Sequence, residues 1–448
     1  MKPAASSPAR DVIRLAWPVL VAQLAVVANG FFDTAMAGRL SAVDLAAVGI
    51  GGSVQASILM SLMGVLLALP PTIAQLHGAG RRADIGQQLH QSLWISLALA
   101  LGAILLLRFP QPFLAISQLD PAVHEKVRAY LDASAWAIPG IFAFRLFFGL
   151  STGIGRPRPV MAFNLLALAL KIPLNALFMY GLFGFRGMGA PGCAVATAVD
   201  TTLIALLAWR WCLGQDAYAD YRLGTRLARP DLHAIAAFLR LGVPIGLTFL
   251  ADVTAFTFMA LFIARLGPVV TGAHQIAANL AVLAYMLPLS IGNATAVLTG
   301  HALGSNDAAR ARRISGTGIA IGLGMAAMVS TLLWTLAPTI AALYTPDAAI
   351  QAIAVPLIAL VGFYHLGDAL QAVAVNALRG YRRSAVPMLI YVTTLWGVGL
   401  GGGVLLGLSG LAGPPRGAAG FWMAAIAGVA IAGGLVTAYL NAVSKPRR

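Results

Sequence analysis

Long apolar stretches alternate with short polar connections along the whole chain. A helix needs about 20 mainly apolar residues to cross a bilayer, and twelve stretches reach that length. The pattern therefore predicts an all-α integral membrane protein with twelve transmembrane helices. The expected helices are 15–36, 46–76, 88–107, 129–152, 160–183, 189–211, 236–264, 271–300, 314–343, 349–377, 386–408 and 418–441.

The twelve stretches form two similar sets of six. Because six is an even number, both halves begin on the same side of the membrane, which predicts parallel repeats around an axis along the membrane normal. We expect an N-lobe at 1–212, a cytoplasmic linker at 213–235 and a C-lobe at 236–448, which makes two homologous six-helix bundles with a site between them. A shift of 226 residues aligns Pro18 with Pro244, Arg39 with Arg265, Gly78 with Gly304 and Arg156 with Arg382.

Composition supports the membrane assignment and explains the charge. The chain is 59% hydrophobic and 10% charged, whereas soluble domains are about 25% charged. Its net charge of +15 is the excess of 30 Lys and Arg residues over 15 Asp and Glu residues. Most of the basic residues fall in cytoplasmic connections if both termini are cytoplasmic. This bias follows the positive-inside rule. We expect a monomer in the cytoplasmic (inner) membrane, in contact with membrane lipid and with no nucleic-acid partner.

Four aspartates interrupt the predicted helices: Asp33, Asp200, Asp252 and Asp368. A carboxylate at membrane depth costs at least roughly 2.5–3.5 kcal/mol on insertion scales, so ionisable groups there usually line a pathway or titrate. Any one of them has an alternative role as a hydrogen-bond partner in helix packing. Together they favour ion-coupled transport.

In the N-terminal half, polar residues occur in pairs that share a helix face. Asp33, Asn175 and Thr197 offer the oxygen ligands that a hard cation prefers, with Lys171 or Asp200 tuning the charge. Two alternatives stay open: Lys171 forms a structural ion pair or contacts substrate, and Asp200 is a counter-ion of Lys171. The pairs are Asn29 with Asp33, Lys171 with Asn175, and Thr197 with Asp200.

The C-terminal half carries a second acid pair. Asp252 shares a helix face with Thr248, and Asp368 shares one with Tyr364. Two carboxylates in a low dielectric favour binding of a proton, while a sodium ion or an organic cation between them favours ionisation. Competition of that kind is what an antiporter needs. Pro18 frees backbone carbonyls in the first helix and is expected to be a hinge that couples Asp33 to movement.

Motifs for other chemistry are weak. The sequence has neither a P-loop nor a His-Glu-x-x-His metal site, so we expect secondary transport, with no catalytic residue and no cofactor besides the coupling ion. The segment 407–410 (GLSG) resembles the serine motif of intramembrane proteases, but no histidine follows His365 to serve as its base. An intramembrane hydrolase is therefore disfavoured.

Several segments resemble the MATE (multidrug and toxic compound extrusion) transporters of the NorM-like branch. The resemblance runs from about residue 10 to residue 440 and implies twelve helices, as in that family. The matching segments are 17–39, 41–47, 73–81, 174–175, 180–181, 272–276 with Asn279, and 368–371 with 378–381.

The resemblance implies a role for each matched residue. Asp33 corresponds to the N-lobe acid that couples protons or sodium, and Asn175 and Thr197 line its neighbourhood. Asp252 stands where many members have glutamate. Asp368 and Tyr364 correspond to the acid and the aromatic residue of the C-lobe cation site. Where some members carry another polar residue, one turn after the asparagine, this chain has Met179.

The implied function is secondary active efflux of cationic or amphiphilic drugs by alternating access, in exchange for sodium ions or protons. Sodium is expected either at Asp33 or at Asp252 and Asp368. The main rival is a flippase for lipid-linked oligosaccharides, from the same superfamily. Flipping an anionic headgroup favours a cationic cavity, whereas the predicted interior holds four acids against Arg145 and Lys171, so this rival is disfavoured.

Overall fold

A computed structural model describes residues 7–111, 120–182, 184, 186–224, 227–411 and 413–445. Thr225 and Arg226 of the expected linker, and the outermost residues of both expected lobes, lie outside this description. The described residues contain twelve helices that are long and apolar enough to cross a membrane. The prediction of an all-α protein with twelve membrane-spanning helices is confirmed.

The chain divides into two compact units. Unit 1 comprises Met1–Leu20 and Leu247–Arg448, and unit 2 comprises Val21–Gly246. Both boundaries lie inside continuous helices, two residues after Pro18 and Pro244, and the 226-residue offset aligns them. The units therefore differ from the lobes expected from the sequence, because each unit takes in the first part of the other half's first helix.

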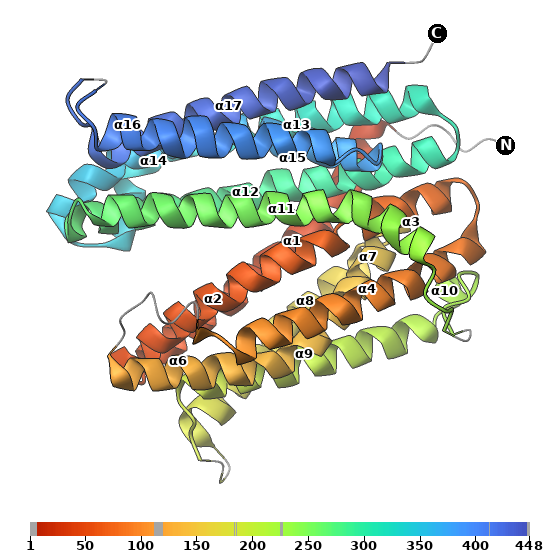
Figure 1. The fold of residues 1–448 in the computed structure, drawn as a ribbon, viewed down its shortest axis with the longest axis horizontal. Helices are drawn as coiled ribbons and strands as arrows, with labels where there is room; N and C mark the ends of the chain where they lie inside the picture. Colours follow the sequence, from red (N-terminus) through yellow and green to blue (C-terminus); the bar gives the residue numbers. More distant parts are fainter. Residues whose placement is uncertain are drawn as a thin grey trace. The chain divides into compact units, whose positions relative to one another are not determined.

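Unit 2 holds the spans of the first half, apart from the part of α1 up to Leu20 (Figure 1). Three of its spans are interrupted. A turn at Leu67 and Ala68 separates α2 from α3, a helical turn, Ala135–Ala137, joins α6 to α7, and a π-helical segment, Ala176–Gly181, follows α8. Proline lacks the N–H that an α-helix needs, and Pro173 lies just before the π-helical segment. The helices are α1 (Pro8–Gly38), α2 (Ala42–Leu66), α3 (Leu69–Gly78), α4 (Arg82–Arg108), α6 (Pro121–Ser134), α7 (Ile138–Gly153), α8 (Arg158–Asn175), α9 (Ala190–Leu213) and α10 (Asp216–Ala219).

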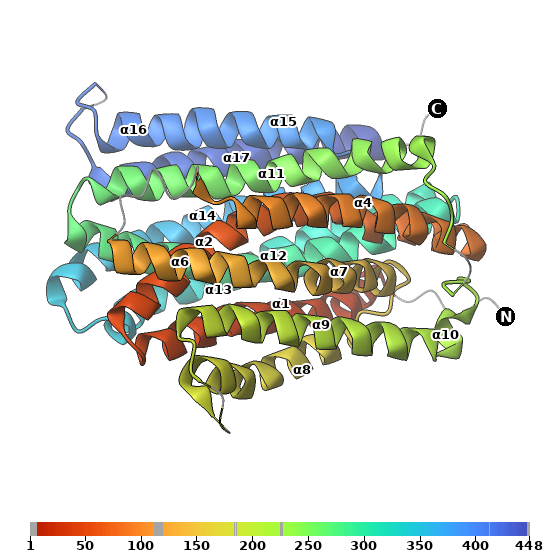
Figure 2. The ribbon, with the colours of Figure 1, turned by 60° about the horizontal axis from the view of Figure 1, so that its bottom comes forward.

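Unit 1 is built around α14, which packs against α12, α13 and α17, and Figure 2 shows the same set from another side. The α15–α16 span has a π-helical middle, Thr394–Gly401. The helices are α11 (Leu232–Ala264), α12 (Pro268–Gly304), α13 (Ala308–Tyr344), α14 (Ala348–Gly380), α15 (Ala385–Thr393), α16 (Gly402–Gly407) and α17 (Gly417–Ser444).

Contacts at the starts of α1 and α11 explain the unit boundaries. Val12 and Ala16 pack into an apolar cluster with residues of α12 and α13, and Arg310 forms an ion pair with Asp11 at 3.6 Å. The start of α11 instead approaches α2, where a Cβ on Gly242 would lie 2.5 Å from the Val65 carbonyl oxygen. Small residues allow such close helix approach in membranes.

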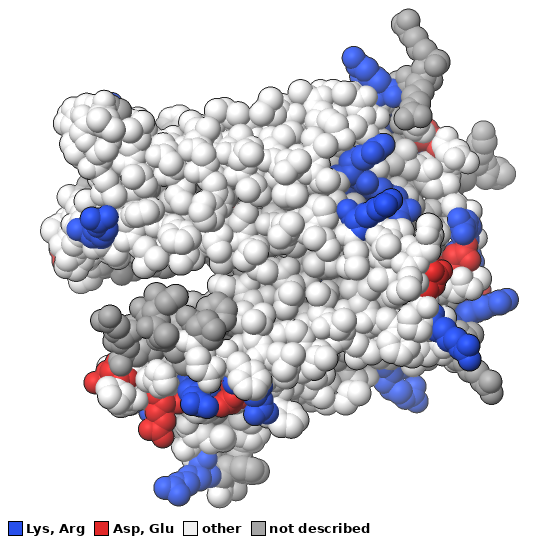
Figure 3. All heavy atoms as spheres, in the orientation of Figure 1, with Lys and Arg blue, Asp and Glu red and all other residues white. Residues whose placement is uncertain are grey.

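The surface shows where charge is placed. Figure 3 shows Lys, Arg, Asp and Glu side chains at the helix ends of each unit and an uncharged band along the helices between them.

The residues before α11 are hydrogen-bonded to α4. Gln91 donates to the Arg229 carbonyl oxygen at 2.9 Å, and Trp94 donates to the Ala228 carbonyl oxygen at 3.0 Å.

Asp44 at the start of α2 joins three helices of unit 2. Its Oδ1 accepts hydrogen bonds from Lys126 Nζ of α6 at 2.7 Å and from the Ala190 N–H of α9 at 2.9 Å. Its Oδ2 accepts one from Ser41 Oγ at 2.6 Å. The Asp44 side chain is 7% exposed, so this acid has a structural role, which we call the Asp44 clasp: it holds α2, α6 and α9 together.

We expect Asp44→Asn to lower the free energy of unfolding of unit 2 by about 1–3 kcal/mol, because buried donors lose a charged acceptor. Thermal unfolding of the purified protein in detergent, followed by tryptophan fluorescence, measures the loss. Asp132→Asn is the control, since its pair with Arg108, at 4.0 Å, is about 40% exposed and such pairs contribute little. Equal shifts for both variants would contradict the clasp.

Candidate functional site

The polar pairs of the first half converge in unit 2. Lys171 Nζ lies 3.0 Å from Asp33 Oδ1 and donates to Thr197 Oγ1 at 2.5 Å. Asn175 Nδ2 donates to the same Asp33 oxygen at 2.7 Å. The Lys171 side chain is 2% exposed and that of Asp33 is 15% exposed. Side chains from α1, α8 and α9 thus meet in one hydrogen-bonded cluster.

Helix geometry aligns these side chains. Lys171 and Asn175 lie four residues apart on α8 and therefore share a face, and the π-helical segment begins directly after Asn175. π-Helical turns occur often at functional sites. Tyr180 donates to the Met36 carbonyl oxygen at 2.8 Å, which holds the end of α1 against this segment.

Three buried acceptors near the cluster are unsatisfied. Asn29 Oδ1, Asn175 Oδ1 and Asp200 Oδ1 have no hydrogen-bond partner within the described parts of the chain. Asp200 is 3% exposed and lies within electrostatic reach of both Lys171 and Asp33. Buried polar groups are normally paired, so these three oxygens are free to accept a hydrogen bond from a group that binds or moves there.

In unit 1, Asp252 lies at a polar pocket. Its Oδ1 accepts a hydrogen bond from Tyr391 of α15 at 2.6 Å. The pocket combines one carboxylate, one guanidinium and several neutral polar groups. Its lining residues are Thr248, Phe249, Asp252, Tyr285, Gln371, Ala372, Val375, Asn376, Arg379 and Tyr391.

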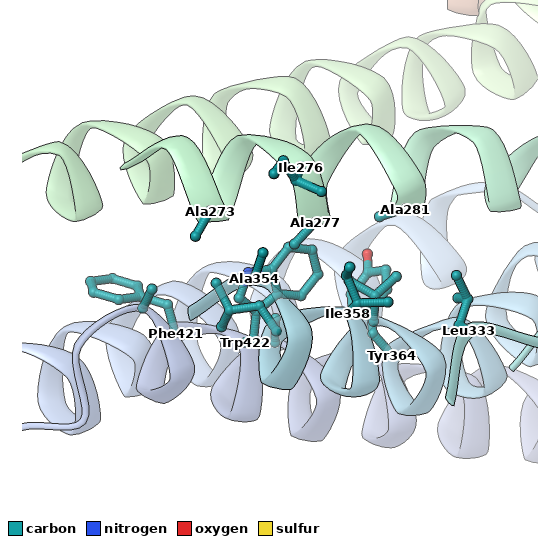
Figure 4. Packing of buried hydrophobic residues seen from close by; sticks show 14 of the residues in the cluster. Ala273, Ile276, Ala277, Ala281, Leu333, Ala354, Ile358, Tyr364, Phe421 and Trp422 are labelled. Carbon is teal, nitrogen blue, oxygen red and sulfur yellow. The ribbon is translucent and has the colours of Figure 1, made fainter. Parts of the chain in front are cut away.

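Asp368 and Tyr364 lie on the same face of α14. Asp368 is 4% exposed and within electrostatic reach of Asp252. The Tyr364 ring meets Trp422 edge-on at 5.6 Å and Phe256 at 6.1 Å, and Figure 4 shows it with Trp422 among the buried apolar residues of α12 and α14. Tyr364 therefore packs among apolar side chains, one helical turn before Asp368.

The structure adds residues that sequence analysis missed. Gln371, Asn376 and Arg379 continue the Asp368 face toward the end of α14, and all three are buried. Arg379 Nη1 donates to Asn376 Oδ1 at 2.9 Å, and its guanidinium lies 5.9 Å from the centre of the Phe249 ring. Their helical spacing from Asp368 was a usable signal, whereas nothing in the sequence pointed to Tyr391.

The sequence of this chain is similar to those of a known protein family. A family model named MatE matches residues 18–177 and 244–405, and the starts of the two matches are related by the 226-residue repeat. The chain is 41% identical to the probable multidrug resistance protein NorM of Chromobacterium violaceum over 440 residues, covering 98% of this chain and 95% of that protein.

Two further matches agree. The multidrug resistance protein PmpM of Pseudomonas aeruginosa is 36% identical over 421 residues, covering 94% of this chain and 88% of that protein. A crystal structure of MATE in the bent conformation superposes with a TM-score of 0.88 at 19% identity, covering 98% of this chain and 96% of that one. That likeness concerns the fold.

Proposed function

The chain belongs to the MatE family and is a multidrug efflux transporter, and we propose that it exports cationic and amphiphilic organic compounds in exchange for sodium ions or protons. The supporting observation is that each unit holds its own acids within spanning helices. Asp200 of unit 2 and Asp368 of unit 1 are buried, while Asp33 of unit 2 and Asp252 of unit 1 are partly buried. Such costly groups are kept in membranes for ion and substrate pathways.

The acids provide the exchange chemistry. An organic cation and a coupling cation compete for the same carboxylates, so binding of one releases the other. In this proposal Asp33, Asn175 and Thr197 form the exchange site of unit 2, and Asp252 and Asp368 form that of unit 1. Asp252, Thr248 and Gln371 line one pocket, and their side chains carry the carboxylate, hydroxyl and amide oxygens that bind a hydrated ion or an ammonium group.

Alternating access requires movement, for which we propose hinges in α1 and α11. Each helix contains a proline just before its chain passes from one unit to the other, Pro18 in α1 and Pro244 in α11. A proline removes one helical hydrogen bond and permits bending. We also propose that the protein works as a monomer in the inner membrane, with both termini in the cytoplasm.

Transport in proteoliposomes with separately imposed ion gradients tests the exchange. The protein is reconstituted, ethidium is supplied on one side, and a sodium or a proton gradient is imposed on the other. We expect ethidium to move against its own gradient when the coupling ion flows the opposite way, and to stop moving when an ionophore collapses that gradient. Liposomes without protein give the background. Ethidium movement that depends on neither gradient would reject antiport.

A further inference from the structure

Lys171 occupies the position that a bound cation would take on Asp33. Its ammonium lies 3.0 Å from Asp33 Oδ1 and donates to Thr197 Oγ1. Both oxygens belong to residues that the sequence pattern proposed as ligands of a hard cation, the third being Asn175. Lys171 is among the largest fully buried side chains of the described structure, so the ammonium is held inside the unit.

Sodium does not fit this cluster as the structure shows it. A hard cation needs several oxygen ligands, yet Asp33 Oδ1 already receives N–H groups from Lys171 and Asn175. The Asn175 amide therefore turns its nitrogen toward the acid. One turn further along, the buried residue is Met179, whose thioether is a poor ligand for sodium.

A second acid is placed to receive the same ammonium. Asp200 follows Thr197 by three residues on α9, so the two share a helix face. Its Oδ1 is buried without a hydrogen-bond partner in the described chain, and a buried carboxylate is costly unless it is paired. Among the described residues, Cys193 of α9 and Tyr130 of α6 also lie within electrostatic reach of Asp33, and neither supplies a positive charge.

We propose that Lys171 is a tethered cation that excludes sodium from Asp33 and yields its place to organic cations by moving toward Asp200. The proposal rests on the proposed efflux function and names the ligand class of the unit 2 site. A lipophilic organic cation neutralises Asp33 in place of Lys171, and the displaced ammonium pairs with Asp200. A small metal ion reaches Asp33 only by displacing the ammonium, and the nitrogen that Asn175 turns toward the acid offers it no oxygen ligand.

Sodium binding to the purified full chain tests the exclusion. Radioactive sodium is measured on Asp252→Asn/Asp368→Asn, which leaves unit 2 as the acid site. We expect no saturable binding in this background, one site after adding Lys171→Gln, and its loss after further adding Asp33→Asn. Lys171→Arg, which keeps the charge, is expected to bind none. Saturable sodium binding in the background or with Lys171→Arg, or none with a folded Lys171→Gln protein, would overturn the proposal.

Binding of tetraphenylphosphonium tests the movement toward Asp200. In the same background, Asp200→Asn removes the acid that receives the displaced ammonium, so we expect the dissociation constant to rise by about tenfold. In the Lys171→Gln protein, Asp200→Asn is expected to change it far less, since no ammonium is displaced. Equal changes in both would refute the movement. These binding measurements need no transport. If they fail while gradient-driven efflux is intact, only the role of Lys171 is rejected. If they succeed while efflux depends on neither gradient, only antiport is rejected.

Discussion

Asp368→Asn is expected to reduce drug export by at least about tenfold, equal to about 1.4 kcal/mol, while the protein stays folded. Asp368 is buried on α14 within electrostatic reach of Asp252. Asparagine has nearly the same size and keeps a hydrogen-bonding group, so packing is preserved. What is lost is the charge that a coupling ion and an organic cation compete for.

Ethidium efflux from proteoliposomes, normalised to the amount of reconstituted protein, measures the effect. Asp347→Asn is a matched control on the same helix, because Asp347 caps the start of α14 by accepting the Ala349 N–H at 2.8 Å. Asparagine is an equally good N-cap, so this variant is expected to export at the wild-type rate. Full export by Asp368→Asn would remove this acid from the exchange site.

The spans were predictable because bilayer thickness sets a length that apolar stretches must match. The residues at which the helices begin and end were less predictable. For example, the stretch 314–343 becomes α13, Ala308–Tyr344, whose first turns are polar and capped by Asp307. The unit boundaries inside α1 and α11 depend on contacts between distant segments, such as Val12 with α12 and Gly242 with α2. A periodic pattern carries no record of those contacts.

In the candidate site too, some features were predictable from the sequence and others were not. Four-residue spacing on one helix correctly placed Lys171 beside Asn175, because helix geometry fixes that proximity. Which acid Lys171 contacts depends on how α1 and α9 pack, and the structure selects Asp33. The partner of Asp252 comes from α15, 139 residues further along. Such long-range pairs follow from tertiary packing, which a single sequence does not reveal.

Asp33→Asn is expected to abolish export and also to destabilise unit 2. Unlike Asp368, Asp33 has a buried cationic partner, Lys171, at 3.0 Å, and an amide donor from Asn175. Removing one member of a buried ion pair typically costs ~3–5 kcal/mol because the remaining charge stays uncompensated. Some of that cost is expected to be recovered as Lys171 turns to Asp200.

The double variant Asp33→Asn/Lys171→Gln separates the two effects. Without the buried ammonium, the uncompensated charge is gone, so we expect its melting temperature in detergent to recover most of the loss seen for Asp33→Asn. Ethidium export is expected to stay absent, because the acid that binds the organic cation is still missing. If export returned along with stability, Asp33 would be a structural partner of Lys171, and the exchange chemistry of unit 2 would have to rest on Asp200.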